Sequence, residues 1–250
     1  MGLSSYKFAP LAFFGFFRYF GHIARDMFRG GQTGEKYASI RRRCVADVFK
    51  SSGIRVETED PLGLLKADKS RIYVMNHESF LDAVILIGEY DGDIRFLAKS
   101  PLFSVPFLGS AMRFERHIPV YRGKAKAKNR GIIDSLEDVF AEGGSVFFFP
   151  EGTRSTDGRL GEFKLGAFIA SVRYGVPIVV VKLEGTGSVM PKGSIGVDNS
   201  GVSKIRVLGE VEAITVTASV DEISAAEAMR DTVRAILVRG EFSSDHGGNA

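Results

Sequence analysis

The chain has 250 residues, of which 44% are hydrophobic and 25% are charged, and its formal net charge is +3. This length and composition are typical of a folded protein with one sizeable domain, and they exclude disordered, collagen-like and repetitive chains. The single cysteine excludes an internal disulfide framework and fits a reducing compartment.

The first segment of the chain is basic and rich in aromatic residues. Residues 1–58 carry ten Lys/Arg against four Asp/Glu. The apolar run at 8–20 is shorter than the roughly 20 residues that a membrane-spanning helix needs. Its apolar residues recur at helical spacing among arginines, which predicts a helix in the membrane interface, with its rings among acyl chains and its cations toward anionic headgroups. A helix docked on the protein's own core is the alternative. The apolar residues are Phe13, Phe16, Phe17, Phe20 and Ile23.

Strand-like and helix-like segments alternate beyond residue 52. This alternation predicts an α/β fold with a mostly parallel central sheet flanked by helices. Strands are expected at 71–75, 94–98, within 114–122, and at 145–149, 176–185 and 204–209. Helices are expected at 79–87, 126–142, 163–174 and 221–240.

Two polar clusters directly follow two of the expected strands. The sequence NHESFLD (76–82) follows the strand at 71–75, and PEGTRS (150–155) follows the strand at 145–149. Open α/β sheets bind ligands at the carboxyl ends of their strands. We therefore expect both clusters to face one crevice.

The first cluster contains a candidate general base, His77, and a candidate partner, Asp82. In a continuous helix their side chains would point about 140° apart, so they meet only if His77 lies in a turn and Asp82 in the first helical turn. Asp82 would then accept from one ring nitrogen and make the other more basic, which suits removal of a proton from an alcohol. No serine or cysteine nucleophile pattern lies nearby, which favours direct attack by a substrate hydroxyl. A structural histidine is the alternative.

The second cluster has the residues that a phosphate-bearing acceptor needs. Gly152 lets the backbone approach a ligand closely. Arg154 offers a planar fork of donors suited to phosphate oxygens. Glu151 can accept from hydroxyls of the acceptor or hold Arg154 in place. A tight glycine turn closed by a Glu–Arg pair is the structural alternative.

Together, these blocks resemble the lysophospholipid acyltransferase family, in particular members like bacterial 1-acylglycerol-3-phosphate acyltransferase. The resemblance covers roughly residues 55–215, and the His–Asp block followed by FPEGTRS in this order and spacing is its most specific part. The fourth block departs from the family pattern, because Val180 stands where the family usually has a second proline. The matching blocks are NHESFLD (76–82), AKSPLFSVPFLG (98–109), HIPVYR (117–122), FPEGTRS (149–155) and VPIVVV (176–181).

The resemblance implies transfer of a fatty acyl group from acyl-CoA or acyl carrier protein to the sn-2 hydroxyl of 1-acylglycerol-3-phosphate (lysophosphatidic acid), giving phosphatidic acid. No bound cofactor or metal is expected. His77 would be the base and Asp82 its partner. The resemblance places the other implied residues in the acceptor site: the cations Lys99, Arg122 and Arg154 as phosphate ligands, together with Glu151, Gly152 and Thr153.

The expected organisation has three parts: membrane-associating helices at 1–50, an acyltransferase domain at 51–242 and a flexible tail at 243–250. The expected location is the cytoplasmic face of the cell membrane, as a peripheral or monotopic protein on an anionic surface. Arg41-Arg42-Arg43 is expected to face headgroups or water rather than nucleic acid, since no recognition motif accompanies it.

Two alternatives to this function remain open at this stage, and one basic segment has several interpretations. The acceptor can be another lysolipid or a glycolipid. The chain can also be a non-catalytic lipid-binding protein on the same fold. The cations of residues 122–130 suit coenzyme A phosphates, an acidic carrier protein or anionic lipid, or they form a solvated basic loop.

Overall fold

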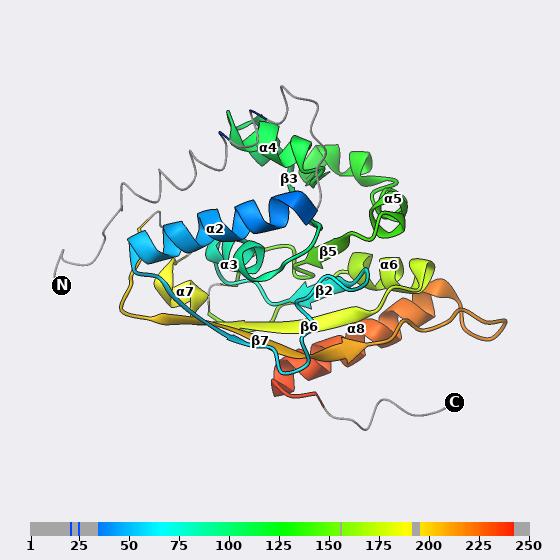
Figure 1. Cartoon of the computed structure of the whole chain (residues 1–250). Coiled ribbons are helices and arrows are strands. Elements are labelled where there is room, and N and C mark those ends of the chain that lie inside the picture. Colours follow the sequence, from blue (N-terminus) through cyan, green and yellow to red (C-terminus); the bar gives the residue numbers. More distant parts are fainter. Residues whose placement is uncertain (1–20, 22–24, 26–34, 156, 192–195, 243–250) are drawn as a thin grey trace.

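The computed structural model describes residues 21, 25, 35–155, 157–191 and 196–242 (Figure 1). The expected interfacial helix, apart from Gly21, and the tail at 243–250 lie outside the described residues. None of the described helices is long and apolar enough to cross a membrane.

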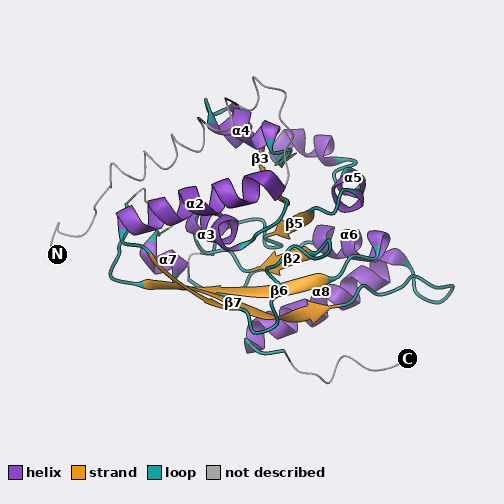
Figure 2. Ribbon diagram, in the orientation of Figure 1, coloured by secondary structure: helices purple, strands orange, loops and turns teal. Residues whose placement is uncertain are grey.

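A seven-stranded sheet forms the centre of the molecule (Figures 1 and 2). Its strand order is β1-β7-β6-β2-β5-β3-β4, and only β6 and β7 are antiparallel neighbours, so the predicted mostly parallel sheet is confirmed. The strand β1 was not predicted. The strands are β1 (Arg55–Glu59), β2 (Ile72–Met75), β3 (Ile94–Lys99), β4 (Ile118–Val120), β5 (Ser145–Phe148), β6 (Ile178–Glu184) and β7 (Val202–Val211).

Helices cover both faces of this sheet, because alternate residues of the buried strands point to opposite sides. In β2, Ile72 and Val74 join a core with α5, α6 and α8, whereas Tyr73 and Met75 join a core with α3. The helix α2 packs on α3 (Figure 1). The helices are α2 (Glu35–Ser52), α3 (Leu81–Glu89), α4 (Leu108–Phe114), α5 (Leu136–Ala141), α6 (Gly166–Tyr174), α7 (Thr186–Val189) and α8 (Glu222–Arg239), with 3₁₀ helices η1 (Ser100–Ser104) and η2 (Gly123–Asn129).

The prediction of a single helix at 126–142 is wrong. The segment contains the end of η2, a turn and the short helix α5. Gly131 has φ +79°, a left-handed conformation that breaks a right-handed helix. The predicted stop after residue 142 is present, since Gly143 also has a positive φ.

Arg41 also differs from the prediction that it faces headgroups or water. Its side chain is 3% exposed, and it donates to Glu115 Oε1 at 3.2 Å and to the Gly92 carbonyl at 2.7 Å. An arginine on α2 is therefore buried against segments much later in the chain. Its neighbours Arg42 and Arg43 are exposed, and Cys44 is buried.

Candidate active site

The two polar clusters meet at one edge of the sheet, as predicted. Strands β2 and β5 are parallel neighbours, so the two segments that follow them leave the sheet at the same edge, at the carboxyl ends of the strands. The Ser155 amide donates to the His77 carbonyl at 2.7 Å, and the His77 amide donates to Glu151 Oε1 at 3.1 Å. The two exits are thus joined directly.

The predicted contact between His77 and Asp82 is present. His77 lies in the turn after β2, and Asp82 lies in the first turn of α3. Nδ1 of His77 is 2.8 Å from Oδ2 of Asp82, and the same oxygen accepts from the amides of Glu78 and Ser79 at 2.8 and 2.9 Å. Because a carboxylate only accepts, this network assigns the proton to Nδ1 and leaves Nε2 as a lone-pair nitrogen.

The orientation of the histidine ring is fixed by its surroundings. The ring of His77 stacks on that of Phe149, with centroids 4.0 Å apart and planes inclined by 24°. The side-chain amide of Asn76 forms two 2.8 Å hydrogen bonds with the backbone of Leu183 at the end of β6. Ser79 Oγ donates to the Met190 carbonyl at 2.6 Å. The turn is thus held by the backbone of Leu183 and Met190, while the His77 side chain keeps about a fifth of its surface exposed.

Glu151 is a buried bridge between two loops. One carboxylate oxygen accepts from the His77 amide, and the other accepts from the Gly161 amide at 2.8 Å. The side chain is nearly buried. This bridging of backbone amides was not predicted from the sequence, and it makes Glu151 a residue that positions the turn carrying His77.

Gly152 lies close to two cations. Arg122 donates from its guanidinium to the Gly152 carbonyl, and Lys164 lies so close that a Cβ added at Gly152 would overlap its Nζ. Gly152 has φ +66°, which also favours glycine. Lys164 was not predicted as a site residue, because only the folded loop brings it back to residue 152. Its amide donates to the Pro150 carbonyl at 3.0 Å.

The remaining predicted site residues lie at the same edge. Lys99 is the last residue of β3, which pairs in parallel with β5, and its side chain is exposed. Thr153 is exposed and Arg154 is partly exposed in the loop after β5. Within the described ranges, no group of three or more His, Cys, Asp and Glu side chains is arranged to hold a metal ion.

A third carboxyl group, that of Glu78, lies in the turn that carries His77. Burial raises the pKa of Glu78, and the negative charges of Asp82, Glu184 and Glu151 act in the same direction. The Gly187 amide, which donates to its carboxylate at 3.4 Å, opposes the rise in pKa. Glu78, next to His77 in the chain, is therefore a half-buried carboxyl group with three other carboxyl groups around it.

Comparison with known proteins matches this site to a family. Residues 54–184, which include both polar clusters, match the sequence profile named Acyltransferase. The chain belongs to the acyltransferase family. Membership confirms the resemblance seen in the sequence, and the family segment runs from the start of β1 to the end of β6.

Two relatives within the family are named 1-acyl-sn-glycerol-3-phosphate acyltransferase. The chain is 39% identical over 157 residues to a chloroplastic 1-acyl-sn-glycerol-3-phosphate acyltransferase of Arabidopsis thaliana. This aligned region is 62% of this chain and 42% of the relative. It is 33% identical over 199 residues to the enzyme of that name from Saccharomyces cerevisiae, and this aligned region is 77% of this chain and 63% of the relative. The chain thus spans less than half the length of the plant relative.

The fold also matches a solved acyltransferase. The crystal structure of the 1-acyl-sn-glycerophosphate acyltransferase from Thermotoga maritima superposes with a TM-score of 0.58. The match covers 92% of this chain and 95% of the other, at 22% sequence identity. At this identity the likeness establishes a shared fold.

Proposed function

We propose that this chain transfers a fatty acyl group from a thioester to the sn-2 hydroxyl of 1-acylglycerol-3-phosphate, producing phosphatidic acid. The observation that carries the proposal is the 2.8 Å contact between His77 and buried Asp82, at the edge where two cations flank Gly152. The relatives named 1-acyl-sn-glycerol-3-phosphate acyltransferase support this choice of acceptor.

His77 acts as the general base in a direct transfer from donor to acceptor, without an acyl-enzyme intermediate. Its Nε2 takes the proton of the acceptor hydroxyl as the hydroxyl oxygen attacks the thioester carbonyl carbon. The tetrahedral intermediate collapses with cleavage of the carbon–sulfur bond, and the departing thiolate receives the proton from Nε2. Asp82 stabilises the imidazolium that exists between these two proton transfers.

The cations bind the phosphate and thereby orient the hydroxyl. Arg122 and Lys164 both lie close to Gly152, and Arg154 lies two residues further along the same loop. Guanidinium and ammonium groups are the usual ligands of phosphate oxygens. Lys99 and Thr153 complete the proposed acceptor site, and Glu151 holds the loops that carry it.

The donor in this proposal is acyl-CoA or acyl carrier protein. Exposed cations of η2 suit the phosphates of coenzyme A or an acidic carrier surface: Lys124, Lys126 and Lys128. We place the protein on the cytoplasmic face of the cell membrane, as a peripheral or monotopic protein. The basic, aromatic composition of residues 1–50 supports this location, with 51–242 as the acyltransferase domain and 243–250 as a tail.

The test is acyl transfer from a long-chain acyl-CoA to 1-acylglycerol-3-phosphate in lipid vesicles, with wild type beside His77→Ala. Phosphatidic acid formed by the wild type alone is the expected result, with both proteins equally stable to heat. Lack of product with this donor and with acyl-carrier-protein donors would overturn the proposed reaction. Equal product from both proteins would overturn the role of His77.

A further inference from the structure

The loop between η1 and α4 holds apolar side chains out in water. Phe107 is 71% exposed, the largest value among the exposed large hydrophobic side chains of the described residues. Val105 is 43% exposed, and Pro106 between them is exposed as well. Exposed apolar surface of this kind carries a free-energy cost in water.

The backbone at Phe107 is strained. Its φ and ψ are +63° and −56°, and the Leu108 amide donates to the Pro106 carbonyl at 2.7 Å. This is a γ-turn of the rare positive-φ type, which is strained for a residue with a side chain. Such strain persists only where the surrounding structure imposes it, and it occurs preferentially at functional sites.

Neighbouring contacts do impose it. Beyond the turn, the Gly109 amide donates to the Val105 carbonyl at 2.8 Å, and Arg113 donates to the Phe103 carbonyl. The backbone of Phe103 also lies so close to Gly109 that an added Cβ would overlap it. The exposed ring is therefore carried by a fixed loop.

The chain on both sides of this loop is strongly cationic in sequence, although Arg116 pairs with Glu142 at 2.6 Å. Residues 99–133 contain eight Lys/Arg and one acidic residue, Glu115, which is buried, so the local balance is 8 − 1 = +7. An apolar tip within a basic surface matches an anionic lipid bilayer, which has an apolar interior beneath negative headgroups. The cations are Lys99, Arg113, Arg116, Arg122, Lys124, Lys126, Lys128 and Arg130.

The loop lies at the catalytic edge of the sheet. It follows β3, and β3 is the parallel neighbour of both β5 and β4. The loop, His77 and Arg122 therefore all follow the carboxyl ends of neighbouring strands. Phe80, which is 49% exposed and follows the catalytic turn, is a further apolar side chain at this edge.

We propose that Val105, Pro106 and Phe107 insert into an anionic bilayer, with the surrounding cations against the headgroups. The catalytic edge then faces the membrane, and a lipid acceptor reaches His77 without passing through water. This consequence for the acceptor rests on the proposed function, whereas insertion of the loop does not.

Tryptophan fluorescence tests the insertion directly, because the chain contains no tryptophan. Phe107→Trp is compared with Leu62→Trp, a control at a 64% exposed leucine between β1 and β2, at the opposite edge of the sheet. Vesicles of phosphatidylcholine with phosphatidylglycerol should shift the emission of the Phe107→Trp variant to the blue, and brominated lipids should quench it. The Leu62→Trp variant should show neither change.

Two results would contradict the proposal. One is an emission of the Phe107→Trp variant that vesicles leave unchanged. The other is an emission already shifted to the blue without vesicles, which would show that another segment of the chain covers the loop.

An activity measurement separates this inference from the proposed function. Phe107→Ser should lower acyl transfer to a long-chain acceptor in vesicles about tenfold or more, as expected for loss of a buried aromatic anchor. Its turnover of a short-chain acceptor dissolved as monomers should equal that of the wild type. Equal losses on both acceptors would overturn the membrane role. Inactivity of the wild type on both would overturn the proposed function and leave the fluorescence result standing.

Discussion

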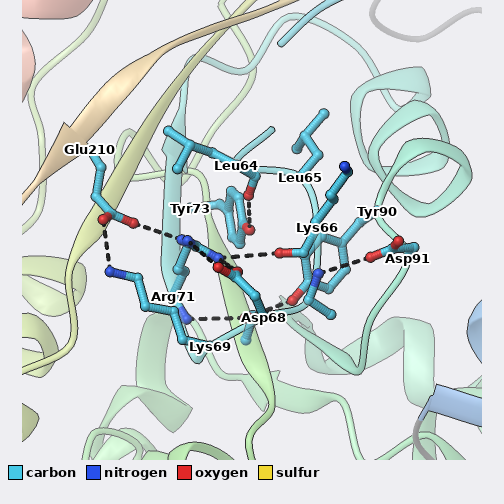
Figure 3. A network of polar contacts seen from close by, with 12 residues as sticks. Leu64, Leu65, Lys66, Asp68, Lys69, Arg71, Tyr73, Tyr90, Asp91 and Glu210 are labelled. Atoms are coloured by element: carbon cyan, nitrogen blue, oxygen red, sulfur yellow. Dashed lines mark hydrogen bonds and ion pairs between the residues drawn. The ribbon is translucent and has the colours of Figure 1, made fainter. Parts of the chain in front are cut away.

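The two edges of the central sheet use their cations in opposite ways. At the amino edge, the buried guanidinium of Arg71 meets carboxylates of Asp68 and Glu210 and the carbonyl of Lys66 (Figure 3). Lys69 shares Glu210 at 2.8 Å. At the carboxyl edge, Arg122 and Lys164 meet the backbone of Gly152 instead.

The difference lies in whether the cations of each edge are paired with carboxylates. Burial alone would lower the pKa of Arg71, but its bonds to Asp68 and Glu210 outweigh burial and raise it. The same contact lowers the pKa of Asp68 to about 2. Within the described part of the chain, Arg122 and Lys164 have no carboxylate partner, so their positive charge remains available for an anion.

Replacing one aspartate at each edge should give the largest contrast. Asp82→Asn should lower kcat by about 10²–10⁴, because three donors converge on Asp82 Oδ2 and an amide cannot hold the imidazolium as a carboxylate does. Asp68→Asn, at the amino edge, should leave kcat unchanged. Steady-state kinetics per folded molecule checks both, and a similar kcat for the two variants would remove the distinction between the edges.

Glu210→Gln should show the converse: lost stability with turnover intact. Removing one partner of the nearly buried Arg71 should lower the free energy of unfolding by about 2 kcal/mol, since Asp68 still pairs with it. Urea denaturation beside an activity assay measures both quantities. A variant that loses kcat per folded molecule would show that the amino edge is not purely structural.

The pH dependence of this loss follows from the pKa of Glu210. Burial raises that pKa, but the bonds to Lys69 and Arg71 outweigh burial and place it below the ordinary 4.5. A carboxyl group with a lowered folded pKa stabilises the fold above its unfolded pKa and loses this contribution as the pH falls through the folded value. The gap between wild type and Glu210→Gln should therefore close in acid.

Lys164→Ala sharpens the contrast on the binding side. Loss of one charge-assisted contact to phosphate should raise KM for the acceptor about tenfold, equivalent to roughly 1.4 kcal/mol. Lys204→Ala is the matched control, since Lys204 is an exposed lysine on β7 that pairs with Glu57 at 3.2 Å. Acceptor titrations at saturating acyl donor measure the change. An unchanged KM would remove Lys164 from the acceptor site.

The smallest effect is expected at Glu78. Because burial raises its pKa, the folded state favours the protonated form, and stability falls as the pH rises through the folded pKa. Glu78→Gln should therefore be more stable than the wild type near neutral pH. The difference should vanish below the ordinary pKa of 4.5. Thermal unfolding across this pH range checks the trend, and a variant that is less stable at neutral pH would contradict it.

Much of the fold could be predicted from local patterns. The buried strands β2, β5 and β6 are short apolar runs, and His77 and Glu151 lie in the loops that follow two of them. Features that depend on distant partners could not be predicted. Arg41 was expected to face headgroups or water, and its burial could not be predicted because its partner Glu115 lies 74 residues away, on another element.

The candidate site divides in the same way. The contact between His77 and Asp82 depends on five residues of chain and was predicted. The bond from the His77 amide to Glu151 spans 74 residues, and the approach of Lys164 to Gly152 depends on the path of a glycine-containing loop. Neither has a periodic signal in the sequence.

The side-chain amide of Asn76 has a consequence for the order of assembly during synthesis. Its two hydrogen bonds join residue 76 to residue 183, and Ser79 bonds to Met190. A nascent chain that ends before these residues has the histidine but no β6 to hold its turn. Contacts this distant in sequence form late, because closing a long loop costs entropy before the contact stabilises it. The turn that carries His77 is therefore held in place only after most of the chain has left the ribosome.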